Sequence, residues 1–134
     1  LQPCEIVTGF TIPKPDPTAQ SAFLKLGARH YLVISIAMVA GILVPTSDGR
    51  IASVSLAGGA CSAVAKRLSE LEAALVGLPL DVDFSQFVTD PYFSDLHPID
   101  DPRASAAYRR EAARILVVRL LNALALKCRM GVAA

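Results

Sequence analysis

The chain is poor in the residues that build metal centres and disulfide frameworks. Its 134 residues include three cysteines, at positions 4, 61 and 128, and two histidines, His30 and His97. Three widely spaced cysteines match neither the ligand spacing of a zinc site nor a disulfide framework. Neither histidine has a Cys or His neighbour at ligand spacing. We therefore expect no metal site in this chain, and a reducing cytoplasm as its location.

Motifs for nucleotide binding and nucleophilic catalysis are also missing. The chain contains no GxGxxG fingerprint, no Walker lysine and no nucleophile elbow. The pair Gly58-Gly59 suggests a phosphate cradle. A glycine pair at the end of a strand is more typical of a bulge or a tight exit from a sheet, and we favour that interpretation.

No segment is long and apolar enough to span a membrane. The longest apolar run, residues 31–44, is interrupted by Ser35 and Gly41 and stops at Pro45. A spanning helix needs about 20 apolar residues, and the β-branched content of this run predicts a buried strand. The 53% hydrophobic content and mean hydropathy of +0.47 are nevertheless high, which indicates a domain partly covered by partners. No signal peptide or initial methionine is visible, so we expect a processed chain or an excised part of a longer one.

Charge is unevenly distributed although the net charge is only +1. Residues 68–101 contain eight acids and no base, whereas residues 102–134 contain seven bases and only Glu111 as an acid. Arg103, Arg110 and Arg114 share a helix face, which would suit nucleic acid. No aromatic residues interleave with them, so we expect no nucleic-acid partner. An internal or intersubunit salt-bridge surface is favoured, with solvated helix faces as the alternative.

Hydrophobic periodicity and turn residues predict strands first and helices afterwards. Residues 4–12 alternate as a strand, with Ile6, Phe10 and Ile12 on one face and Val7 on the other. The remaining predicted elements are a rigid loop at 14–17, strands at 21–26, 34–44 and 50–56, a hairpin turn at 46–49, a helix at 66–75, a shorter helical piece at 82–96 broken at 90–91, and a long helix at about 103–127. The predicted fold is a single α+β domain over residues 1–134: an antiparallel three- to four-stranded sheet with about three helices packed on one face.

Near its start, the predicted long helix carries a charged side chain, Arg109, on its apolar face. Asp101 followed by Pro102 is a good helix entry, and Ser105 offers a second possible cap. Arg109 falls on the apolar face of the helix, where a guanidinium must find a partner or reach the surface. Asp100 and Asp101 are the nearest candidate partners. We favour the simpler interpretation, in which Arg109 extends past the edge of the core to water.

Five segments in order resemble one known family. PIDDPRASAAYRR, at residues 98–110, is similar to a motif in the C-terminal domain of the FAD-binding (medium) subunit of molybdenum hydroxylases, the carbon monoxide dehydrogenase and xanthine dehydrogenase family. The other four matching segments are residues 5–13, 23–29, 48–59 and 72–77. Where many members have Gly-Gly-x-Ala-Pro-Thr-Pro before an arginine, this chain lacks both prolines, which should loosen that connection.

The resemblance implies a cofactor role without a catalytic residue. Val7 and Lys25 match family FAD contacts, and Arg29 and His30 match a loop near the flavin in relatives. Val7 would pack on the flavin ring, and Lys25 would stabilise negative charge that develops on reduction. We expect structural or interface roles for another set of residues: Asp100, Asp101, Arg103, Tyr108 and Arg109.

In this interpretation the chain completes one edge of a flavin pocket in an oxidoreductase. The FAD-binding N-terminal domains are absent from it, so the isolated chain should not retain FAD or be active. Its partners would be those domains, a molybdopterin-binding large subunit and a [2Fe–2S] small subunit, with electrons passing from the clusters to FAD. The alternative is a stand-alone interaction or dimerisation module without redox activity.

Overall fold

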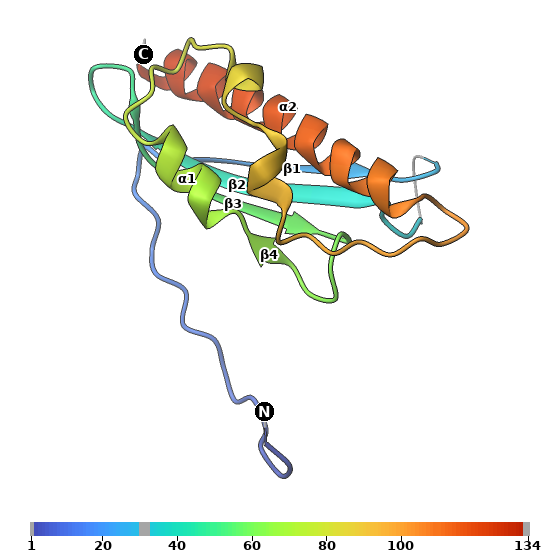
Figure 1. The fold of residues 1–134 in the computed structure, drawn as a ribbon. Helices are drawn as coiled ribbons and strands as arrows, with labels where there is room; N and C mark the ends of the chain where they lie inside the picture. The colour runs from blue at the N-terminus through green and yellow to red at the C-terminus, as the bar shows by residue number, and fades with distance from the viewer. Residues whose placement is uncertain (1, 30–32, 133–134) are drawn as a thin grey trace.

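A computed structural model of the chain describes residues 2–29 and 33–132. Its centre is one antiparallel sheet with the strand order β1-β2-β3-β4 (Figure 1). The strands are β1 (Gln20–Leu26), β2 (Ala37–Pro45), β3 (Ile51–Gly59) and the short β4 (Lys66–Arg67). The predicted α+β class and the antiparallel sheet are confirmed.

The strands follow from alternation of side chains between the two faces. In β2 every second residue is buried, and Ala37, Val39 and Leu43 are at most 1% exposed. The β2–β3 hairpin turns at residues 46–49, as predicted, and Gly49 has a φ of +79°, which glycine adopts without strain. The Thr46 backbone N–H donates to the Arg50 carbonyl at 2.8 Å and closes the turn. Local sequence therefore fixes the register of the two longest strands.

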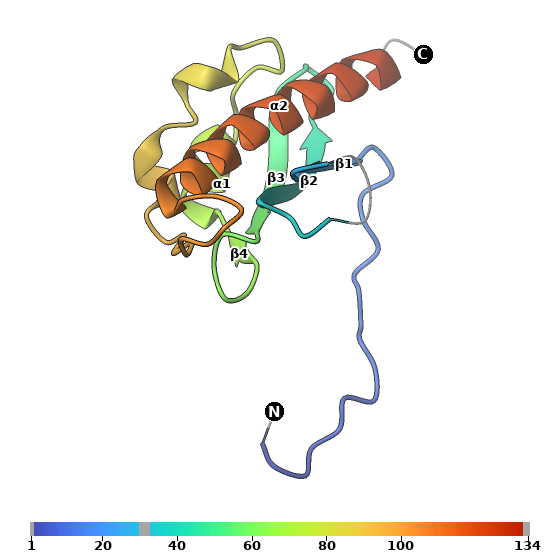
Figure 2. The same cartoon turned by 90° about the vertical axis from the view of Figure 1, so that its right-hand side faces the viewer.

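One face of the sheet is covered by helical elements (Figures 1 and 2). These are α1 (Ser69–Leu75), the 3₁₀ turns η1 (Phe84–Gln86) and η2 (Asp90–Phe93), and the long α2 (Ala106–Val132). Helix α2 crosses β1 and β2, and it approaches closely at Gly41, where a Cβ would lie 2.5 Å from Leu120 Cδ2. A single core results, built from the inner sheet face and the apolar sides of the helices.

Several predicted elements differ in the structure. The predicted helix at 66–75 is wrong in its first turn, because residues 66–67 pair with β3 as β4. The region 82–96 forms two 3₁₀ turns rather than a helical piece, and Pro91 lies at the beginning of the second. The long helix begins at Ala106 and extends through Val132. Two α-helices and two 3₁₀ turns therefore cover the sheet, instead of about three helices.

The opening strand predicted at residues 4–12 is wrong. Residues 2–19 contain no strand, and Figure 1 shows this segment leading away from the domain. Ile6, Phe10 and Ile12 are 84–89% exposed. A strand exists only when its backbone N–H and C=O groups pair with a neighbouring strand, and none of the four strands reaches this segment. The apolar residues of this segment do alternate, but no strand among the described residues pairs with it.

Candidate functional site

Lys25 lies at the end of β1 on the face of the sheet away from the helices. This orientation of Lys25 follows from the alternation of side chains in β1, because even-numbered residues are partly buried under α2 and odd-numbered residues are exposed. The Lys25 ammonium donates a hydrogen bond from Nζ to the Val33 carbonyl oxygen at 2.7 Å. The connection returns to the sheet at Ile36, whose backbone N–H donates to the Leu26 carbonyl at 2.8 Å. Lys25 is therefore exposed but held in place.

A hollow of about 350 Å³ adjoins this lysine. It is lined by Lys25, Leu26, Gly27, Arg29 and Val33. A Cβ on Gly27 would lie 2.4 Å from Val33 Cγ1, so the close approach of these two residues requires glycine. Arg29 lies on the same hollow as Lys25, and its predicted flavin-loop role stays a prediction. His30, the other predicted loop residue, lies outside the described residues.

Val7 does not line this hollow. It lies in the extended segment before β1 and is 49% exposed. The structure thus brings Lys25 and Arg29 together and leaves Val7 apart from them. The predicted orientation of Val7, opposite Ile6 and Phe10 on a strand, is wrong because no strand forms there.

Among the residues that the structure describes, Arg109 is the one buried charged side chain, with 2% of its surface exposed. Its Nη2 donates to Asp101 Oδ1 at 2.6 Å, and its Nη1 donates to the Ile36 carbonyl at 2.8 Å. The favoured interpretation, in which Arg109 extends to water, is wrong: the guanidinium turns inward and spans from the loop before α2 to the start of β2. The sequence suggested the Asp101 partner, whereas the Ile36 carbonyl carried no sequence signal.

Asp101 organises the loop that precedes α2. Its Oδ1 accepts the Arg103 backbone N–H at 2.9 Å, and Oδ2 lies 3.0 Å from Arg103 Nη1. The backbone hydrogen bond from Arg103, with the hydrogen bond from Arg109 and the Arg103 charge, lowers the pKa of the Asp101 carboxyl below its ordinary value. Asp101 therefore remains ionised and serves both arginines at neutral pH.

The helix begins one turn later than Asp101-Pro102 predicted. Asp100 Oδ1 accepts the Ala106 N–H at 2.6 Å, and Ser105 Oγ accepts the Tyr108 N–H at 3.2 Å. These two side chains satisfy free N–H groups of the first turn. Tyr108 is 54% exposed, which suits the predicted interface role but does not test it.

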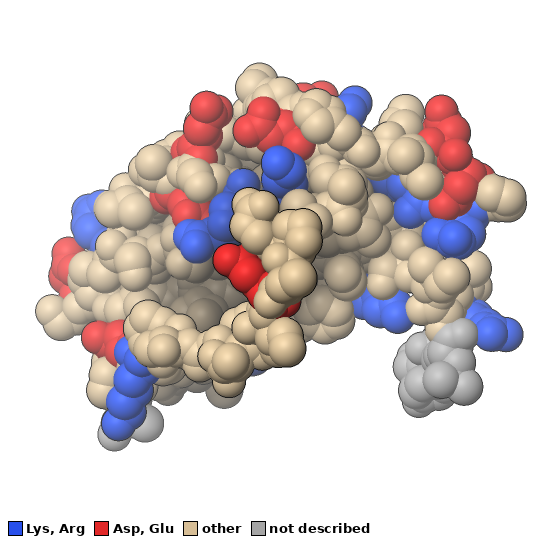
Figure 3. Space-filling view, turned by 90° about the horizontal axis from the view of Figure 1, so that it is seen from below, with Lys and Arg blue, Asp and Glu red and all other residues tan. Residues whose placement is uncertain are grey.

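Some side chains of the acidic segment, residues 68–101, contact side chains of the basic segment, residues 102–134. Arg114 pairs with Glu111 at 2.6 Å and lies 3.5 Å from Asp90, and Arg110 donates to the Leu96 carbonyl at 3.2 Å. Figure 3 shows acidic and basic side chains intermixed on the face viewed from below. The predicted internal ion pairs are present at Arg103, Arg109 and Arg114, whereas Arg110 donates to a backbone carbonyl rather than to an acid. No single-sign patch suited to nucleic acid appears in that view.

Gly58-Gly59 does not form a phosphate cradle. Both residues belong to β3 and pair with Val39 and Met38 of β2. A Cβ on Gly59 would lie 2.6 Å from Met38 Cε, so Gly59 serves close packing, whereas a Cβ on Gly58 would meet Leu96 at an ordinary 3.7 Å. The exit from the strand is at Ala60, whose φ of +62° is unusual for a residue with a Cβ. The expected tight exit is present, one residue after the pair.

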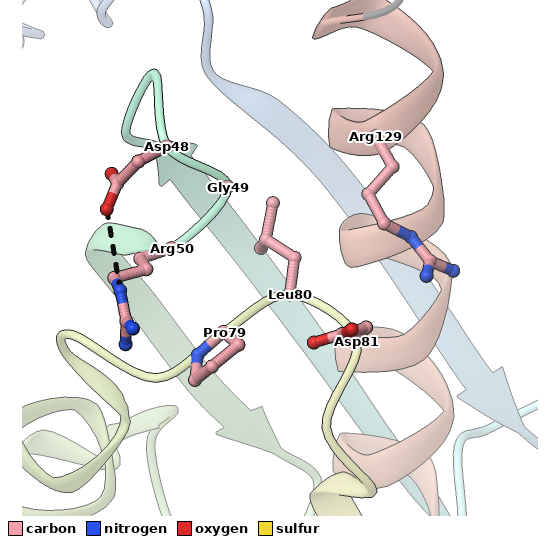
Figure 4. Close-up of a pocket in the computed structure, with 7 residues that line it drawn as sticks. All are labelled: Asp48, Gly49, Arg50, Pro79, Leu80, Asp81 and Arg129. Carbon is pink, nitrogen blue, oxygen red and sulfur yellow. Dashed lines mark ion pairs between the residues drawn. The ribbon is translucent and has the colours of Figure 1, made fainter.

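A further hollow lies at the opposite end of the sheet from Lys25, beside the β2–β3 turn (Figure 4). Asp48 lies 3.4 Å from Arg50 and the Arg50 Nη1 donates to the Gly77 carbonyl at 2.9 Å. Asp81 and Arg129 come from other elements and make no ion pair with the residues drawn. Its charged groups do not converge on one point.

Within the described part of the chain, no group of three or more His, Cys, Asp or Glu side chains is placed to hold a metal ion. Across the same residues, no helix combines the length and apolar character needed to cross a membrane.

Comparisons with known proteins agree on one family. The sequence profile of the CO dehydrogenase flavoprotein C-terminal domain matches residues 22–124. The nicotinate dehydrogenase FAD-subunit of Eubacterium barkeri is 28% identical over 115 residues, which cover 85% of this chain and 38% of that protein. The chain therefore spans well under half the length of this relative.

Solved structures show the same fold. The carbon monoxide dehydrogenase of Hydrogenophaga pseudoflava is 26% identical with a TM-score of 0.77, over 87% of this chain and 40% of the matched chain. Quinoline 2-oxidoreductase of Pseudomonas putida 86 is 21% identical with a TM-score of 0.74, over 85% of this chain and 39% of the matched chain. Because the profile match covers most of the chain and the fold agrees with it, this chain belongs to the CO dehydrogenase flavoprotein C-terminal domain family.

Proposed function

We propose that the chain is the C-terminal domain of an FAD-binding subunit in a molybdenum-hydroxylase type of oxidoreductase. In this role it forms one edge of the flavin pocket and docks other parts of the enzyme. The relative named as an FAD-subunit supports the cofactor assignment. The single observation that carries the proposal within this chain is the fixed, exposed ammonium of Lys25 beside a hollow.

The residues around Lys25 fit a flavin edge. An ammonium has three N–H donors, and the Val33 carbonyl takes one, which leaves two for the carbonyl oxygens of a flavin pyrimidine ring. When bound, FAD would accept electrons from iron–sulfur clusters and deliver them to an external acceptor. Lys25 would hold the pyrimidine edge and stabilise negative charge that develops there. Val7 would reach the flavin only when its segment is packed against another domain.

Exposed apolar side chains support docking to further domains or subunits. On the sheet face away from the helices, Phe23 is 57% exposed and Ile42 is 43% exposed. The segment before β1 adds the exposed Ile6, Phe10 and Ile12. Exposed apolar groups on this scale are typical of surfaces that a partner covers. The partners proposed are the FAD-binding N-terminal domains, a molybdopterin-binding large subunit and a [2Fe–2S] small subunit.

The test is the substitution Lys25→Gln in the complete polypeptide that the gene encodes. Loss of one exposed positive charge near the flavin should lower its midpoint potential by roughly 20–30 mV, and FAD retention should weaken. Lys127→Gln is the matched control, because Lys127 likewise donates to one backbone carbonyl, that of Ser21 at 3.0 Å. A potential and FAD occupancy that are unchanged in Lys25→Gln would remove Lys25 from the flavin site.

The same exposed apolar groups favour a second candidate, a dimerisation module without redox activity. Sedimentation of the 134-residue chain and a flavin absorbance spectrum separate the two. We expect a colourless chain whose complete polypeptide is yellow. A complete polypeptide that lacks flavin and forms a stable dimer would favour the second candidate.

A further inference from the structure

A cavity of about 590 Å³ lies where β2 begins and β3 ends. Three loops line it, and they comprise residues before β2, the connection from β3 to β4, and the segment before α2. It shares no lining residue with the hollow beside Lys25. An inference about this cavity therefore stands apart from the proposed flavin role.

Three large aliphatic side chains line the cavity while remaining mostly exposed to solvent. Ile34 is 65% exposed, Val64 is 67% exposed and Ile99 is 70% exposed. Each comes from a different loop, so their meeting at one cavity results from the fold rather than from local sequence. Apolar side chains gathered in this way are typical of ligand or partner contacts.

The charge of the cavity is positive. Its lining includes Lys66, Arg103 and Arg109, but only one acid, Asp101. Asp101 pairs with both arginines, at 2.6 Å for Arg109 and 3.0 Å for Arg103, which leaves a surplus of positive charge. The ammonium of Lys66 is exposed, and it makes no hydrogen bond or ion pair within the described part of the chain. A positive, partly apolar cavity favours an anion that carries an apolar body.

Two local irregularities coincide with this cavity. Arg109 Nε is buried without a hydrogen-bond partner, and it is the one such side-chain nitrogen or oxygen in the described residues. Ala60, also in the lining, has a φ of +62°. Unsatisfied buried groups and strained backbone are concentrated at functional sites in proteins.

We propose that this cavity binds a small organic anion, with a carboxylate or phosphate group on an apolar body. The anionic group lies against Lys66 and Arg103, and the apolar body packs between Ile34, Val64 and Ile99. The volume falls within the range of about 300–1,000 Å³ that small-molecule sites occupy. Arg109 lies at the bottom of the cavity, and its side chain stays in place when a ligand binds because it is buried.

The test is an NMR titration of the ¹⁵N-labelled 134-residue chain with phenylacetate. The amides of residues 34–35, 60–66, 99–101 and 103 should shift along one saturable curve, with a dissociation constant on the order of 1 mM. Acetate and benzyl alcohol, which carry the charge or the apolar body alone, should bind at least about tenfold more weakly. A parallel titration with phenyl phosphate shows which anionic group the cavity prefers.

Substitutions separate this site from general charge attraction. Lys66→Glu should weaken phenylacetate binding about tenfold or more, whereas Arg119→Glu, which makes the same charge change on an exposed part of α2, should leave it unchanged. Val64→Asn should also weaken binding, with the exposed Val76→Asn as its control. The proposal is overturned if neither aromatic anion gives saturable shifts up to about 20 mM, or if Arg119→Glu weakens binding as much as Lys66→Glu.

Discussion

Replacing Arg109 by methionine tests whether the buried guanidinium holds the loop before α2 against the start of β2. Methionine keeps the length and the apolar stem but removes the donors to Asp101 and to the Ile36 carbonyl. A lost hydrogen bond to a charged group costs about 1.5–3 kcal/mol, and a buried carbonyl left without a donor costs about 1–3 kcal/mol. Ile36 is 7% exposed, so water does not easily replace the guanidinium there.

These losses are partly offset because the charge no longer needs to be buried. We expect Arg109→Met to lower the free energy of unfolding by about 2–4 kcal/mol, roughly a 30- to 1,000-fold change in the folded-to-unfolded ratio. Arg103→Met is the matched control, since Arg103 contacts the same Asp101 but its side chain is 40% exposed. It should change stability by no more than about 0.5 kcal/mol.

Urea unfolding of the two variants and the parent chain measures this difference, with the denaturant slope checked for constancy. Hydrogen exchange gives an independent measurement at the Ile36 amide, which bonds the Leu26 carbonyl at 2.8 Å. Protection of this amide should fall in Arg109→Met more than in Arg103→Met. If both variants unfold at the same urea concentration, the buried guanidinium does not hold β2 to the loop before α2, and the reasoning is refuted.

Three further predictions concern packing, pH and the open face of the sheet. Leu120→Ala should destabilise the chain by about 3–5 kcal/mol in urea unfolding. In the parent chain, the methyl group of Gly41→Ala crowds Leu120, so Gly41→Ala should lower the free energy of unfolding less in the Leu120→Ala variant than in the parent chain. Burial raises the pKa of Glu72, but hydrogen bonds from Arg67 and the Leu56 N–H outweigh it and leave the pKa lowered. Stability from this group is present above pH about 4.5 and is lost as pH falls through the depressed value, so Glu72→Gln should flatten the acid limb of a stability-against-pH curve. Phe23→Ser should reduce any self-association seen in sedimentation without loss of stability above about 1 kcal/mol, because Phe23 is 57% exposed.

The core of the fold was predictable because its signals are local. The turn at residues 46–49 and the alternation of β2 fix two strands and their register. The apolar repeat of α2 then identifies the side of the helix that packs on the sheet. The errors arose where local signals compete. Residues 66–67 have helical neighbours on one side, but their backbone groups pair with Ala57 and Gly58, and this pairing of distant residues overrides local preference.

The candidate site was less predictable, for a different reason. Lys25 was singled out only by the family resemblance, because an exposed lysine at the end of a strand carries no signal by itself. The Val33 carbonyl that holds it and the Ile36 carbonyl that binds Arg109 are backbone groups, which the identity of a residue does not reveal. Helix periodicity alone predicts that Arg109 extends past the core edge to water. The fold overturned it, because Asp101 and the start of β2 both lie within reach.

The failure of the opening strand is informative about the rest of the protein. Helix α2 and the strands form because the apolar side of the helix meets the inner face of the sheet within the same domain. The segment before β1 has an equally clear alternation, yet its Ile6 and Phe10 are 85% and 89% exposed. A pattern that predicts burial but finds no partner among the described residues indicates a partner outside them. The relative that is matched over 38% of its length has a further 62% in which such a partner can lie. The same physical rule that makes the sheet predictable therefore marks the segment before β1 as the surface that, under the proposed function, packs against a further domain.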